Sequence, residues 1–128
     1  MKAVRLTAPK HFEFIDIEQP QAIDGQCLVK LEKVSVCGSD IRHHYGPIKE
    51  ESAYPMDPGL PCHELAGVVL ESRTDSIKEG QRVIVIPARG TGGLQQYVVS
   101  DPSRMIVLPE QGPLDEWLMC QPSGTVLY

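Results

Sequence analysis

Residues 59–67, GLPCHELAG, place a thiol, an imidazole and a carboxylate at the start of an apolar run. A second stretch, VCGSD at residues 36–40, adds another thiol, a hydroxyl and a further carboxylate at the end of a strand-like run. Polar groups are costly to bury unless each finds a partner, so this set indicates side chains that contact one another or a metal ion. We therefore expect a fold that brings the two stretches together.

Zinc is the metal that this donor set suits. Cys37 offers a thiolate and His63 a neutral imidazole, which together form a borderline-soft pair. A carboxylate oxygen added to them, with one position left to water, describes a catalytic zinc site, because structural sites are closed by four protein ligands. The sequence contains no pair of cysteines separated by two residues, so a zinc finger or ribbon is not expected.

Several segments, in this order, resemble the catalytic domain of the medium-chain, zinc-dependent alcohol and polyol dehydrogenases. They are MKAV at the start, CGSD, HELAGVV, GQRVIV at residues 80–85 and GGLQQY at residues 92–97. The resemblance covers nearly the whole chain. It implies a GroES-like, partly open antiparallel β-barrel over residues 1–128, as the N-terminal part of a longer dehydrogenase whose Rossmann-type cofactor domain is absent here.

The residue pattern independently favours a mainly β protein with short helices. About five or six short strands separated by glycine and proline turns are typical of an antiparallel barrel or open sandwich. The expected strands fall at residues 3–6, 12–17, 27–36, 65–72, 82–87 and 106–109, with a short helix after Cys37 and a final helix over 114–128.

The resemblance implies a ligand set for the metal. Cys37, His63 and Glu64 would bind zinc, as in polyol-type members of the family. Gln121 aligns with a family position that carries a Cys, Asp or Glu ligand, and its neutral amide is a poorer donor, with Cys120 adjacent. Both Glu64 and Gln121 are candidates for the metal site, and we predict that Glu64, rather than Gln121, supplies the carboxylate-type ligand.

The resemblance also implies groups that handle protons. Ser39 would contact the alcohol oxygen and begin a relay to solvent. Asp40 would accept a hydrogen bond from the ligating histidine, with a plain helix cap as the alternative. The relay often continues to a histidine at the position of Arg42, so His43 or His44 would substitute; we assign His43, against the alternative of a surface pair.

The implied activity is interconversion of an alcohol or polyol and its carbonyl compound with NAD or NADP. Zinc would polarise the carbon–oxygen bond, and hydride would pass to or from a nicotinamide bound by another domain. Two alternatives remain, a zinc-free quinone-reductase-like domain and a non-enzymatic GroES-like binding module. We expect the chain alone to bind metal without turnover. Metal analysis separates the zinc-dependent domain from the two alternatives, because only the first should bind stoichiometric zinc.

Composition limits the other functions. The 128 residues are 41% hydrophobic and 23% charged, which fits one domain with its own core. The net charge is −5 and the basic residues are scattered, so we expect no nucleic-acid partner. With no signal peptide or membrane-length apolar run, we expect a cytoplasmic protein with reduced cysteines, a small-molecule alcohol or carbonyl substrate and a homo-oligomeric state.

Three smaller expectations concern individual segments. The GTGG run at residues 90–93 lacks the third glycine of a dinucleotide fingerprint, and strand-like sequence follows it, so we do not assign it to nucleotide binding.

Cys27 is expected in the core, and Cys62, where the family usually has glycine, is expected on the opposite face of the strand from the ligands. The apolar side chains of the final helix are expected to be partly exposed, namely Trp117, Leu118, Val126 and Leu127.

Overall fold

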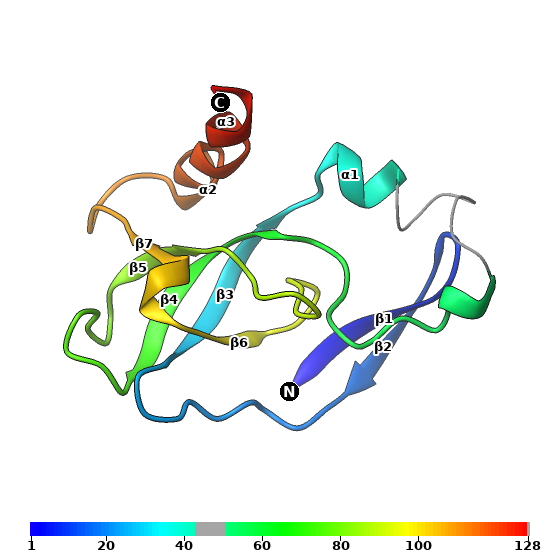
Figure 1. The fold of residues 1–128 in the computed structure, drawn as a ribbon, viewed down its shortest axis with the longest axis horizontal. Helices are drawn as coiled ribbons and strands as arrows, with labels where there is room; N and C mark the ends of the chain where they lie inside the picture. The colour runs from blue at the N-terminus through cyan, green and yellow to red at the C-terminus, as the bar shows by residue number, and fades with distance from the viewer. Residues whose placement is uncertain (43–50, 128) are drawn as a thin grey trace.

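The computed structural model describes residues 1–42 and 51–127 (Figure 1). Within these ranges the helices are short: α1 (Gly38–Asp40), the 3-10 turns η2 (Glu51–Ala53) and η3 (Pro102–Arg104), α2 (Leu114–Leu118) and α3 (Cys120–Val126). The strands are β1 (Lys2–Ala8), β2 (His11–Asp16), β3 (Cys27–Ser35), β4 (Glu64–Ser72), β5 (Arg82–Val85), β6 (Tyr97–Ser100) and β7 (Met105–Val107). The mainly β architecture is the expected one, with seven strands in the described residues where five or six were predicted.

The strands form two antiparallel sheets. One contains β1 and β2, and the other has the order β6-β3-β4-β5-β7. The sheets meet where Ala3 bridges to Gln95 and the N–H of Val4 donates to the carbonyl oxygen of Leu94 over 2.8 Å. The β1–β2 hairpin therefore lies against the larger sheet through the loop that precedes β6 (Figure 1).

The central strand β4 is buried on both faces. Its successive side chains point to opposite sides, so Leu65 faces the barrel interior while Ala66 faces α2. The interior cluster comprises Cys27, Val29, Leu65, Val69, Ile77, Val83, Val85, Val98 and Met105, and the cluster under α2 comprises Ala66, Ile84, Leu108, Leu114 and Leu118. Cys27 is fully buried, as predicted for a core residue.

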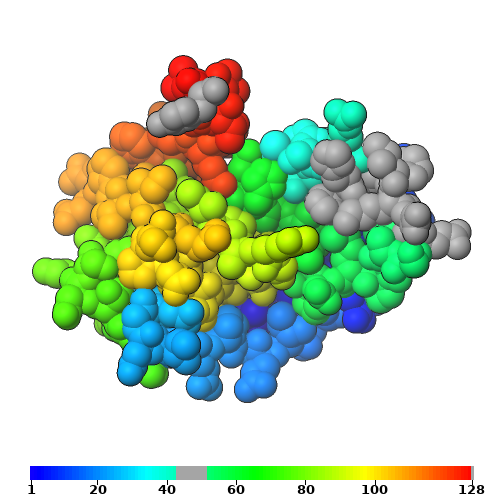
Figure 2. Space-filling view, in the orientation of Figure 1, coloured from blue at the N-terminus to red at the C-terminus, as the bar shows by residue number. Residues whose placement is uncertain are grey.

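The C-terminal segment forms two short helices, where the sequence predicted one. The break after α2 follows from Pro122, which has no N–H to donate to the carbonyl oxygen of Leu118. Leu118 is only 3% exposed, so its predicted exposure was wrong: α2 turns this side chain onto β4. Val126 and Leu127 are 83% and 84% exposed, as predicted, and Figure 2 shows α3 standing above the body, separated from α1 by an open notch.

Two further properties of the described residues bear on function. The four cysteines, all within the described ranges, form no disulfide with one another. The helices in residues 1–42 and 51–127 are each too short or too polar to cross a bilayer.

Candidate metal centre

The pairing of β3 with β4 brings the two polar stretches together. Ser35, at the end of β3, lies opposite Glu64, at the start of β4. Cys37 lies two residues after β3, at the N-cap position of α1, and His63 directly precedes β4. The antiparallel register therefore places side chains far apart in the sequence at the same end of the sheet.

Cys37, His63 and Glu64 form a compact donor cluster. One ligand atom from each residue lies within 4.8 Å of the other two. Ligand atoms around a single tetrahedral zinc ion are separated by roughly 3.5 Å, so the cluster is close to the size that one ion needs. Glu64 is buried, Cys37 is half-buried and the His63 side chain is 46% exposed, so the cluster is closed by protein on one side and open on the other.

The carboxylate of Asp40 connects both stretches beneath this cluster. It is 1% exposed, and it accepts hydrogen bonds from the N–H of Cys37 over 2.9 Å and the N–H of Cys62 over 3.2 Å. Its Oδ1 also lies 3.3 Å from Nδ1 of His63. A ring held at Nδ1 leaves Nε2 available to a metal. Asp40 thus caps the N-terminus of α1 and also contacts His63. The helix cap and the histidine contact, which the sequence offered as alternatives, occur together.

Gln121 reaches the cluster from α3. Its Nε2 donates a hydrogen bond to the carbonyl oxygen of His63 over 2.6 Å, so the amide nitrogen faces the backbone of His63. Its Oε1 is buried and has no hydrogen-bond partner among the described residues. An unpaired buried oxygen costs about 1–3 kcal/mol, so this position favours a hydrogen-bond donor or a cation. The donor set and this oxygen both fit a bound divalent metal.

The other predicted site residues are placed as follows. Ser39 lies exposed on α1, between Cys37 and Asp40 in the sequence. His43 lies outside the described residues. Cys120 is exposed at the start of α3, outside the donor cluster.

Cys62 is also outside the cluster, but the predicted reason was wrong. It precedes β4, and its position follows from a left-handed backbone with φ of 72°, so strand alternation does not apply to it. Such a conformation favours glycine. The sequence signal for this was present, because glycine is the residue that the resembled family usually has there.

A family model described as "Alcohol dehydrogenase GroES-like domain" matches residues 23–110. The chain belongs to this family. The fold and the recognition of a zinc-type dehydrogenase domain made from the sequence are therefore confirmed.

Known members of the alcohol dehydrogenase GroES-like family extend beyond this chain. (R,R)-butanediol dehydrogenase from Bacillus subtilis is 27% identical over 100% of the chain, which covers 46% of that protein. The crystal structure of 2R,3R-butanediol dehydrogenase from Bacillus subtilis matches 99% of this chain and 46% of that one, at 27% identity and a TM-score of 0.80. D-arabitol-phosphate dehydrogenase from Enterococcus avium is 36% identical over 65% of this chain and 24% of its own length. The chain spans less than half the length of these relatives.

The contacts of Asp40 generate a prediction for the Asp40→Asn substitution. The amide would point N–H groups at backbone donors, so we expect the metal-free chain to lose about 1–3 kcal/mol of unfolding free energy. Zinc affinity should fall about 10- to 100-fold, because His63 loses its carboxylate partner. Urea unfolding and competition against a chromophoric chelator measure the two effects. Asp75→Asn, on an exposed residue outside the site, is the control and should change neither; wild-type zinc affinity in Asp40→Asn would contradict the assignment.

Proposed function

We propose that the chain is the catalytic zinc domain of an NAD(P)-dependent oxidoreductase that interconverts an alcohol or polyol and its carbonyl compound. The observation that carries this proposal is the cluster of Cys37, His63 and Glu64 around a half-open position, with Asp40 behind it. Family membership supports the reaction class. Relatives named for a diol and for a polyol phosphate support the substrate class.

The metal ligands follow from charge and placement. Cys37, His63 and Glu64 would hold one zinc ion, which when bound polarises a carbon–oxygen bond and favours loss of the hydroxyl proton. A thiolate and a carboxylate together balance a divalent cation. Gln121, whose buried Oε1 has no partner in residues 1–42 and 51–127, would contribute at most a neutral oxygen, so we assign the anionic oxygen ligand to Glu64.

The remaining residues position the reactants and move a proton. Asp40 holds the imidazole of His63 in one orientation through the contact at Nδ1. The hydroxyl of Ser39 can both accept and donate a proton, and its exposed place on α1 suits transfer from the substrate hydroxyl to solvent. His43 is the proposed next member of this relay.

Hydride transfer requires NAD or NADP, and we propose that a nucleotide-binding domain outside these 128 residues supplies most of that site. The surface suited to such a partner lies on α3, where a shallow, open and mainly apolar hollow of about 440 Å³ is lined by Met119, Pro122, Ser123, Val126 and Leu127. Residues 1–128 would then be a GroES-like zinc-binding domain of a cytoplasmic homo-oligomer that acts on a small-molecule substrate.

Metal analysis tests the ligand assignment. The purified chain should bind about one zinc ion per molecule, and Cys37→Ser should lose most of it while remaining folded, because the core clusters do not include Cys37. Cys120→Ser is the matched control and should keep its zinc. Zinc retained by Cys37→Ser, or lost from Cys120→Ser, would show that the ligands are assigned wrongly.

Binding of an alcohol tests the reaction class separately from the metal. We expect the visible spectrum of the cobalt(II)-loaded chain to change in a saturable way when 2,3-butanediol is added, because the open side of the cluster admits a hydroxyl. The dimethyl ether of the same diol should give no such change. No response to the diol, or an equal response to the ether, would argue against an alcohol dehydrogenase site.

A further inference from the structure

His63 lies just outside the regular hydrogen-bond ladder of the sheet. The β3–β4 register begins at the pair Ser35 and Glu64, so the carboxylate ligand is fixed by β4 while the imidazole belongs to the preceding segment, residues 59–63. Asp40 holds this segment on one side, through the N–H of Cys62. The position of the imidazole therefore depends on what holds residues 59–62 on the other side.

The loop at residues 90–95 provides that second support. The N–H of Gly93 donates to the carbonyl oxygen of Cys62, and the N–H of Leu94 donates to that of Gly59, each over 2.9 Å. Gly92 packs directly on the same segment: a Cβ atom there would lie 2.3 Å from the oxygen of Gly59 and 2.4 Å from that of Pro61. Backbone therefore contacts backbone with no room for a side chain.

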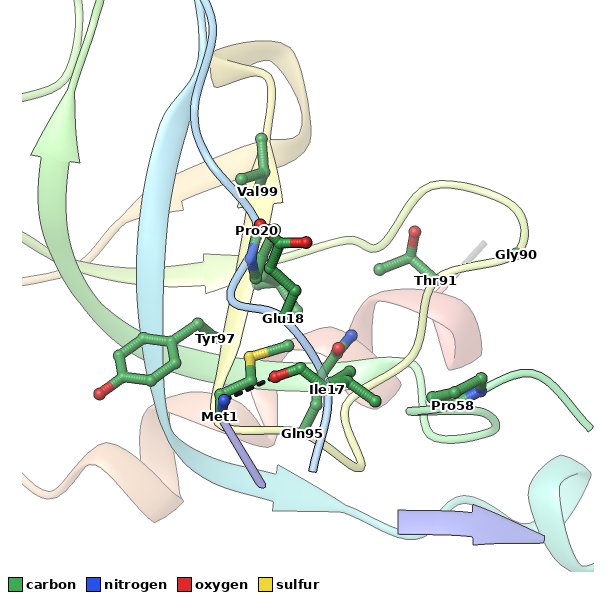
Figure 3. A pocket seen from close by; sticks show the side chains of 11 residues that line it. Met1, Ile17, Glu18, Pro20, Pro58, Gly90, Thr91, Gln95, Tyr97 and Val99 are labelled. Carbon is green, nitrogen blue, oxygen red and sulfur yellow. Dashed lines mark hydrogen bonds between the residues drawn. The ribbon is translucent and has the colours of Figure 1, made fainter. Parts of the chain in front are cut away.

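The side chain of Gln95 packs against both glycines of this backbone contact, Gly92 and Gly59. Its Nε2 donates to the carbonyl oxygen of Gly92 over 2.8 Å, while its amide lies over Gly59, where a Cβ atom would be 2.9 Å from Cδ of Gln95. Gly59 adopts a φ of 86°, which suits glycine. A pocket of about 310 Å³ is lined by Gln95 together with Pro58 and Thr91, among others. Figure 3 shows how these side chains lie around it.

We propose that Gln95 is a positioning residue for the metal centre. By its hydrogen bond to Gly92 and its packing over Gly59, it would hold residues 59–62 in place, and so set the imidazole of His63 relative to Cys37 and Glu64. The proposal rests on the proposed metal-binding function. Among the described residues, the Gln95 side chain contacts Gly92 and Gly59 and is not part of the donor cluster, so its effect would pass through the backbone.

Gln96 provides a matched control. It has the same side chain at the next position, but its Oε1 accepts the N–H of Lys2 over 2.7 Å on the exposed edge of the hairpin. We expect Gln95→Ala to lower the zinc affinity of the 128-residue chain about tenfold, the lower end of the range for residues that support a ligand. Gln96→Ala should leave the affinity unchanged.

A readout without metal separates positioning from general stability. In the zinc-free chain, the ring ¹⁵N signals of His63 report its tautomer and its contact with Asp40. Gln95→Ala should shift these signals, whereas Gln96→Ala should not, and urea unfolding of both variants shows whether each is folded. If Gln95→Ala fails to fold, Gln95→Glu keeps the side-chain size, removes the donor to Gly92 and carries the same expectation.

The outcomes are distinct. Weaker zinc binding together with shifted His63 signals in the Gln95 variant alone supports the proposal. Zinc affinity and His63 signals equal to wild type, even in a less stable Gln95 variant, would overturn it, as would equal losses in the Gln96 variant. Failure of the wild-type chain to bind zinc would instead contradict the proposed function.

Discussion

The buried carboxylate of Asp40 is the contact on which the site depends. A carboxylate at 1% exposure is stable only when its oxygens are hydrogen-bonded, and here the donors come from the two stretches that carry the ligands. The N–H of Cys37 and the N–H of Cys62 converge on it, with Nδ1 of His63 beside them. Satisfying one buried charge thus places the thiol and the imidazole at the same end of the sheet.

The third proposed ligand, Glu64, is positioned by the sheet. Glu64 takes its place from the β4 ladder, which Gly67 allows to approach β3 closely, since a Cβ atom at that position would lie 2.0 Å from the carbonyl oxygen of Lys30. Gln121 adds a contact from α3 to the carbonyl oxygen of His63. Strand pairing and hydrogen bonds therefore hold the segments that carry the ligands, and the site is open at the half-exposed imidazole, as a centre that admits a substrate requires.

The sequence predicted the parts that depend on local pattern and donor chemistry. Cys37, His63 and Glu64 were identifiable because a thiol, an imidazole and a carboxylate within apolar sequence are unusual. The strands followed from short alternating or apolar runs between glycine and proline turns. The break in the final helix was missed, although Pro122 was visible, because apolar spacing was given more weight than the missing N–H. The burial of Leu118 depends on which face of α2 meets β4, and the support of residues 59–62 by Gln95 depends on a side chain that meets a distant loop; neither leaves a pattern in the sequence.

The central claim is that one zinc ion is held by one thiolate, one imidazole and one carboxylate. X-ray absorption at the zinc edge of the loaded chain tests this directly. The account predicts a single sulfur at about 2.3 Å, with the remaining ligands nitrogen or oxygen at about 2.0–2.2 Å. Two or more sulfurs, which would require Cys62 or Cys120 at the metal, or none at all, would contradict it.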